Sequence, residues 1–183
     1  MSGLPWAWGA TPAEVLADHP ADALVGPGAR AMTRAVDVAA PPAVTWRWVC
    51  QLAVAPYSYD LVDNLGRRSP RTLTPGAGEL RLGQRMAVVF EVVELDPPRS
   101  WTGLAQGWCA ATYAVTPRPG GSRLVARMSV TADSVATRVR AHVLAWGDLV
   151  MMRKQLLTLR DLAEATDPAA VPDSGRGDLP HAR

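Results

Sequence analysis

The chain has 183 residues, of which 48% are hydrophobic and 20% charged, and its formal net charge is +2. This length suits one domain around a single core, and the composition is that of an ordinary globular protein. The near-balanced charge, with no basic run interleaved with aromatic residues, argues against nucleic-acid binding. The sequence contains no apolar run of about 18 residues, so no membrane span is predicted.

Residues 1–28 are rich in Pro, Gly and Ala and are expected to form an N-terminal arm that lies across the domain. Thr11 and Glu14 fit a capping box, with Pro12 at the first helical position, so a short helix is predicted over 11–18. The segment lacks the basic start and apolar core of a signal peptide, so we expect a cytoplasmic protein.

The central region predicts one strand, two short helices and then a series of strands. Residues 30–40 are expected to form a strand and 41–53 a helix opened by proline. Ser58 is the expected N-cap of a second helix that stops at Gly66. Runs of about 10 residues, separated by Pro and Gly, then predict antiparallel strands. These runs cover 85–96, 100–106, 108–117 and 122–132.

The last of these runs has a clear alternation of side chains. Leu124, Ala126, Met128 and Val130 share one face, and Arg123, Val125, Arg127, Ser129 and Thr131 share the other. The pattern predicts a sheet with one dry and one wet side.

A long helix is predicted over 134–165, about 45 Å at 1.5 Å per residue. Asp133 or Ser134 is its expected N-cap, and the tail at 167–183 lacks periodicity and is expected to be disordered. A one-sided sheet needs a cover, and this helix is the only large one available. We therefore predict an α+β fold in which a curved antiparallel sheet of about seven strands wraps around the long helix. A cavity is expected between them, with the two short helices as its lid.

Seven segments, in this order, resemble a known superfamily. They read "WGATPAEV" (8–15), "DVAAPPAVTWRWVCQL" (37–52), "YSYDLVDNLG" (57–66), "LRLGQRMAV" (80–88), "ELDPPRSW" (94–101), "GGSRLVAR" (120–127) and "LVMMRKQLLTLRDLAE" (149–164). The chain resembles a bacterial branch of the START and birch-pollen-allergen superfamily, also called SRPBCC or the polyketide cyclase/dehydrase and lipid-transport family. The resemblance implies the helix-grip fold, in a ligand-binding domain at 29–166, and binding of a hydrophobic small molecule, sometimes with chemistry on it. It does not fix the ligand, because fold does not determine function.

Two of the three tyrosines, Tyr57 and Tyr59, lie at the start of the second short helix. Their phenols could point into the cavity as hydrogen-bond donors to a ligand carbonyl, or they could pack the lid against the sheet. Asp60 follows in the first helical turn, where the helix dipole favours its ionised form. All three are candidate site residues.

His142 is the second candidate for chemistry. Positions 142, 145, 149, 152, 156 and 159 share one helix face, and His142 is its only polar member. It could act as a general acid or base in the cavity, or it could be satisfied by a backbone carbonyl at the seam between helix and sheet. No second ligand stands at metal-binding spacing, so neither a metal nor a cofactor is expected.

The remaining candidates are large side chains that could line the cavity or simply form core, and one amide. Together with Asp60, the predicted ligand-binding residues are Trp48, Gln51, Phe90, Trp101, Tyr113, Met128, Trp146, Leu149 and Met152. Cys50 and Cys109 each lie in an apolar run, which indicates buried free thiols, with a disulfide as the alternative.

The sequence therefore leaves three classes of function open. The first is a carrier that binds a polyketide-, lipid- or isoprenoid-like molecule as a monomer or homodimer. The second is a cyclase, aromatase or dehydratase of lyase or isomerase type, in which Tyr57, Tyr59 or His142 moves a proton. The third is a protein-interaction role. No phosphate-binding loop or Ser-His-Asp arrangement is present.

Overall fold

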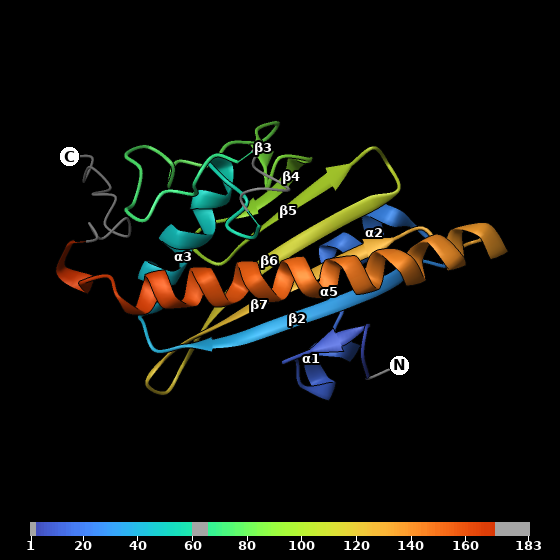
Figure 1. Ribbon diagram of the computed structural model, residues 1–183, viewed down its shortest axis with the longest axis horizontal. Helices are drawn as coiled ribbons and strands as arrows, with labels where there is room; N and C mark the ends of the chain where they lie inside the picture. The colour runs from blue at the N-terminus through green and yellow to red at the C-terminus, as the bar shows by residue number, and fades with distance from the viewer. Residues whose placement is uncertain (1–2, 60–65, 171–183) are drawn as a thin grey trace, which may run out of the picture.

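The structure, a computed structural model, describes residues 3–59 and 66–170. A long helix lies along one face of a seven-stranded sheet, as the helix-grip prediction requires (Figure 1). Most of the second predicted helix, at 60–65, and the tail at 171–183 lie outside the described residues. In the part of the tail that is described, Pro168–Ala170 form one turn of 3-10 helix.

The sheet has the strand order β1-β2-β7-β6-β5-β4-β3. Neighbouring strands are antiparallel, except that β1 pairs in parallel with β2 at one edge. The strands are β1 (Ala7–Trp8), β2 (Arg30–Val38), β3 (Arg85–Met86), β4 (Phe90–Asp96), β5 (Ser100–Ala105), β6 (Cys109–Arg118) and β7 (Gly121–Val130). The predicted strand at 30–40 and the last three predicted runs are thus confirmed.

The helices also follow the sequence signals closely. They are α1 (Pro12–Leu16), α2 (Pro20–Val25), α3 (Pro42–Cys50), continued by a 3-10 turn at Gln51–Ala53, and α5 (Val135–Glu164). Thr11 and Glu14 form the predicted capping box, and Ser134 is the N-cap of α5. The arm also contains α2 and β1, which the sequence analysis did not predict.

The run at 85–96 was predicted as one strand, and this is wrong. It is divided into β3 and β4 by a turn in which Ala87 and Val88 both have positive φ, 44° and 72°. Ala87 N–H donates to the carbonyl of Leu52, 2.7 Å away, instead of continuing the ladder. A hydrogen bond to the 3-10 turn therefore overrides the β-propensity of the valines.

The sheet face predicted to be wet is instead covered by the N-terminal arm. Val125, Arg127 and Ser129 point to this outer face and are all buried. Helix α2 packs there against β5, β6 and β7, on the side opposite α5 (Figure 1). Alternation correctly separated the two faces, but it could not reveal that a segment 100 residues away covers the polar one.

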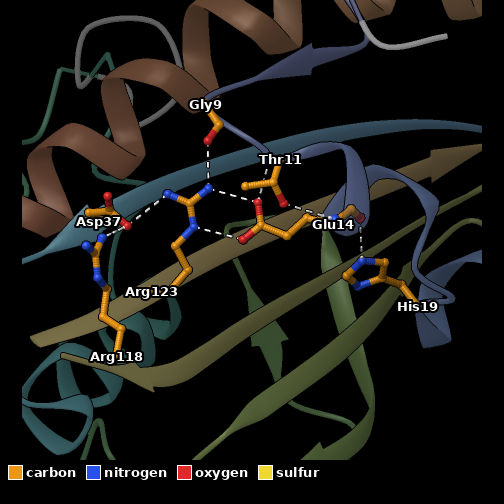
Figure 2. Close-up of polar contacts among 7 residues, drawn as sticks. All are labelled: Gly9, Thr11, Glu14, His19, Asp37, Arg118 and Arg123. Carbon is orange, nitrogen blue, oxygen red and sulfur yellow. Dashed lines mark hydrogen bonds and ion pairs between the residues drawn. The ribbon is translucent and has the colours of Figure 1, made fainter.

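Arg123 fastens α1 to this outer face (Figure 2). Its guanidinium donates to both carboxylate oxygens of Glu14 at 2.8 Å and to the carbonyl of Gly9 at 2.6 Å. It also pairs with Asp37 at 3.0 Å, and Asp37 in turn pairs with Arg118. The hydrogen bond from Arg123 lowers the pKa of Glu14 although partial burial opposes this effect.

Arg127 binds α2 in the same way, four residues further along β7. Its guanidinium bonds both carboxylate oxygens of Asp22, at 3.1 and 3.0 Å, and also Thr33 Oγ1 at 2.7 Å. Ser129 donates a further hydrogen bond to Asp22. One carboxylate therefore accepts hydrogen bonds from both Arg127 and Ser129 beneath α2.

Replacing Asp22 with Asn is expected to lower the free energy of unfolding by about 2 kcal/mol, since charge-assisted bonds to the buried guanidinium of Arg127 are lost. Urea unfolding measures this change. Asp18→Asn, at an exposed position of the same arm, is the matched control and should change stability by less than about 0.5 kcal/mol. An equal effect of both substitutions would contradict the role given to Asp22.

The same carboxylate predicts a pH dependence. Partial burial alone would raise the pKa of Asp22, but hydrogen bonds from Arg127 and Ser129 outweigh burial and hold its pKa below the usual value. Its stabilising contribution is therefore present above the unfolded pKa, near 3.8, and is lost as the pH falls through the folded pKa. Asp22→Asn should flatten that acid limb of the stability profile.

Candidate functional site

A cavity of about 1100 Å³ lies between the inner face of the sheet and the middle of α5. Strands β5, β6 and β7 form its floor, and α5 from Val143 to Gln155 forms its roof. The turn at 87–89, Gln106 and Trp108 lie around it at the strand ends. The predicted gap between sheet and helix is thus present.

The strand register explains why this space stays open. Ala111 faces Met128 across the β6–β7 pair, and Tyr113 faces Ala126. Each large inner side chain thus lies beside an alanine, and Gly147 leaves a gap in the helix above. A Cβ added at Gly147 would meet no atom within 4 Å. The sheet and the helix therefore do not fill the space between them.

One polar group at the cavity wall is a fixed phenol. Tyr113 donates its hydroxyl hydrogen to Gln155 Oε1 at 2.6 Å, and Gln155 Nε2 donates to the carbonyl of Pro56 at 2.6 Å. Trp101 stacks behind the Tyr113 ring, with centroids 4.7 Å apart. Burial raises the pKa of Tyr113, so the phenol is neutral at physiological pH.

The second polar group is Asp148, whose side chain is only 4% exposed and lines the cavity from α5. Arg34 Nη2, from β2, lies 2.8 Å from Asp148 Oδ2. Asp148 Oδ1 has no hydrogen-bond partner among the described residues. Burial raises the pKa of Asp148 to about 6 although the ion pair with Arg34 opposes this shift.

Arg34 is held in place by backbone carbonyls from three parts of the chain. Its guanidinium donates to Pro5 at 2.7 Å, to Trp6 at 3.0 Å, to Thr33 at 3.2 Å and to Ala145 at 3.4 Å. The arm, β2 and α5 therefore meet at one buried cation. Arg34 lies beneath the helix rather than in the cavity wall, so Asp148 is the member of the pair that a ligand can reach.

Four of the predicted ligand-binding residues line the cavity: Phe90, Tyr113, Met128 and Met152. Trp48, Gln51 and Trp101 are buried but lie outside its wall. Leu149 is partly buried and Trp146 is exposed, and neither is in the wall. Asp60 lies outside the described residues.

The structure does not bring the three acid/base candidates together in the cavity. Tyr57 is buried, with φ of +56°, and its hydroxyl donates to Gln51 Oε1 at 3.4 Å. Its ring meets Trp48 edge-on, so it packs the core. Tyr59 is 43% exposed. His142 is also exposed, with its ring 5.8 Å from that of Trp6, beside a separate hollow of about 310 Å³.

The two cysteines are both buried and free, which confirms the thiol prediction over the disulfide alternative. Burial raises the pKa of each thiol to about 12, so neither is a thiolate at neutral pH. Cys109 lines the cavity near Asp148, whose charge further raises the Cys109 pKa.

Sequence reasoning missed Asp148, Arg34 and Gln155, although a signal for each was present. Arg34 shares the inner side of β2 with Met32 and Val36, where alternation predicts apolar residues. Asp148 and Gln155 lie three residues beyond Ala145 and Met152, on the buried side of α5. A charged residue on the apolar side of each of two packed elements indicates a buried pair.

Within the described residues, no group of three His, Cys, Asp or Glu side chains is placed to hold a metal ion. Over the same part of the chain, no helix combines the length and apolar character needed to cross a membrane.

A family model described as polyketide cyclase / dehydrase and lipid transport matches residues 29–164, about three quarters of the chain. No curated protein matches the sequence. Among solved structures, protein MLL2253 of Mesorhizobium loti is 18% identical, with a TM-score of 0.49, over 75% of this chain and 99% of that one. Protein Ms6760 of Mycobacterium smegmatis is 20% identical, with a TM-score of 0.49, over 75% and 92%. Ara h 8.0201 is 8% identical, with a TM-score of 0.48, over 76% and 100%.

Proposed function

Because the chain belongs to the polyketide cyclase/dehydrase and lipid transport family, we propose that it binds a hydrophobic small molecule between its sheet and α5. The single observation that carries this proposal is the cavity of about 1100 Å³. Pockets for small molecules typically measure about 300–1,000 Å³ and combine apolar walls with a few placed polar groups.

The character of the wall supports an apolar ligand. Val88, Val89 and Phe90 line one side, Met128 lies in the floor, and Met151 and Met152 lie in the roof. Methionine side chains adapt to irregular guests because they are unbranched and polarisable. Contact with such a wall removes apolar ligand surface from water, which contributes about 25 cal/mol per Å².

Binding is better supported than catalysis by the predicted acid/base groups. A proton-transfer residue must lie within hydrogen-bond reach of the substrate. Tyr57 packs in the core, while Tyr59 and His142 are exposed, and none of the three is in the cavity wall. A carrier needs only the cavity, and we therefore propose a binding protein for a polyketide-, lipid- or isoprenoid-like molecule.

Titration of the full chain with Nile red, a neutral apolar dye, tests the proposal. We expect saturable binding of one dye per chain, with the blue-shifted emission of an apolar environment. Native mass spectrometry of freshly purified protein then identifies any small molecule that co-purifies. A linear, non-saturating rise in emission across the titration would overturn the proposed function.

A further inference from the structure

We infer that the inner end of the cavity, where Asp148 and Tyr113 lie, selects ligands that carry a hydroxyl group, through a hydrogen bond donated to Asp148 Oδ1. The same end rejects ligands that carry a carboxylate. This inference rests on the proposed function, because it assumes that an apolar molecule enters the cavity. It names the chemical class of that molecule: an apolar alcohol or phenol.

The fold leaves a carboxylate oxygen of Asp148 without a hydrogen-bond partner in the described part of the chain. Asp148 lies in the cavity wall, and both of its carboxylate oxygens are buried without a hydrogen-bond partner among the described residues; Oδ2 forms the ion pair with Arg34, whereas Oδ1 has no partner. A buried acceptor without a partner carries a desolvation penalty. A ligand that donates to this atom removes that penalty, so the gain exceeds that of a hydrogen bond at the surface.

The hydroxyl oxygen of Tyr113 can also accept a hydrogen bond. Tyr113 uses its single hydroxyl hydrogen on Gln155 Oε1 at 2.6 Å, which leaves a lone pair on its oxygen. Both Tyr113 and Asp148 lie in the cavity wall, and the charge of Asp148 adds to burial in raising the pKa of Tyr113. Two acceptors at one end of the cavity match a group that donates.

The charges around Asp148 disfavour a ligand carboxylate. Arg34 forms an ion pair with Asp148, but it does not line the cavity, and its Nη groups donate to the carbonyls of Pro5, Trp6, Thr33 and Ala145. Arg34 is therefore not presented to the cavity. A ligand carboxylate at this end would face the Asp148 carboxylate and a phenol that has no hydrogen to spare, so its burial there is unfavourable.

The charged groups at the outer rim do not change this result. Arg85 and Glu91 face each other across the β3–β4 pair and line the cavity together. The guanidinium of Arg127 is bound to Asp22 on the outer face of the sheet. The asymmetry between acceptors and donors is thus a property of the inner end.

Three naphthalenes of nearly equal size test the inference by isothermal titration calorimetry at pH 7. We expect 2-naphthol to bind at least about tenfold more tightly than 2-methylnaphthalene, because only 2-naphthol can donate a hydrogen bond to the charged carboxylate. We expect 2-naphthoate to bind at least about tenfold more weakly than 2-methylnaphthalene. Equal affinities for 2-naphthol and 2-methylnaphthalene, or tighter binding of 2-naphthoate, would overturn it.

Two variants assign any preference to Asp148. In Asp148→Asn, and in the double variant Arg34→Met/Asp148→Leu, the advantage of 2-naphthol should fall to less than about threefold while 2-methylnaphthalene still binds. Asp161→Asn, exposed on the same helix, should leave all three affinities unchanged. A 2-naphthol preference that survives in both folded variants would contradict the inference. If none of the three compounds binds the unaltered chain, the proposed function itself fails, and this is a different outcome.

Discussion

Replacing Arg34 with Met is expected to lower the free energy of unfolding by about 3–5 kcal/mol, the usual effect of removing one partner from a buried ion pair. The Arg34 side chain is 1% exposed and joins the arm, β2 and α5. Its loss leaves the buried Asp148 carboxylate without its counter-charge and the carbonyls of Pro5 and Trp6 without their hydrogen-bond donor. Urea unfolding, monitored by circular dichroism, measures the change.

Two comparisons make this expectation specific. Arg160→Met removes an exposed pairing with the neighbouring Asp161 and should change stability by less than about 0.5 kcal/mol. The double variant Arg34→Met/Asp148→Leu should recover part of the loss, because no charge then remains buried. A cost below about 1 kcal/mol for Arg34→Met would show that the buried pair does not join these elements.

The loss should also depend on pH. Burial raises the pKa of Asp148 to about 6, above its unfolded value of 3.8, so the folded chain binds this proton more tightly. The contribution of this carboxyl to stability is therefore greatest below pH 4 and declines as the pH rises through 6. Without Arg34 the carboxyl favours its protonated form further, so Arg34→Met should be less destabilising at pH 5 than at pH 8.

Filling the cavity is expected to abolish tight binding. In the double variant Ala105→Phe/Ala111→Trp, two small residues of the cavity wall become large aromatic ones. We expect Nile red affinity to fall at least about 30-fold, equivalent to about 2 kcal/mol, because the guest loses its space. Fluorescence titration measures the affinity, and urea unfolding shows whether the variant is folded.

Ala136→Phe is the matched control for this experiment. It adds an aromatic ring at an exposed position near the start of α5, away from the cavity wall. Its affinity for Nile red should equal that of the unaltered chain. Unchanged binding in the filled variant, provided that it folds, would place the dye somewhere other than between sheet and helix.

The fold could be predicted from the sequence because its signals are local and repeated. The sequence marks β2, β5, β6, β7 and α5 nearly to their ends. The signals are alternating apolar and polar side chains, Pro and Gly between the elements, and helix N-cap residues. The exceptions depend on distant contacts. The arm covers the outer face only because Glu14 and Asp22 meet Arg123 and Arg127 from β7. No local pattern indicates such a meeting.

The site was harder to predict because its key residues violate the pattern that was used to find it. The helix stripe through 142, 149 and 156 was chosen because it is almost wholly apolar. Ala145, Leu156 and Leu159 of that stripe are buried, but the buried side of α5 passes through Ala141 rather than His142 and also contains Asp148 and Gln155. A shift of one residue moves a helix face by about 100°, which turned His142 outward. Seeking apolar residues alone therefore excluded the polar ones that the fold buries.

The most direct test of the cavity as the binding site is an NMR measurement on the full chain, methyl-labelled at Met and Val, with Nile red bound. Intermolecular nuclear Overhauser effects should connect the dye to the methyl groups of Met128 and Met152, on opposite walls of the cavity. Val135 and Val139, in the outer hollow beside His142, should show none. Cross-peaks from the dye to Val135 and Val139, with none to Met128 and Met152, would contradict the account.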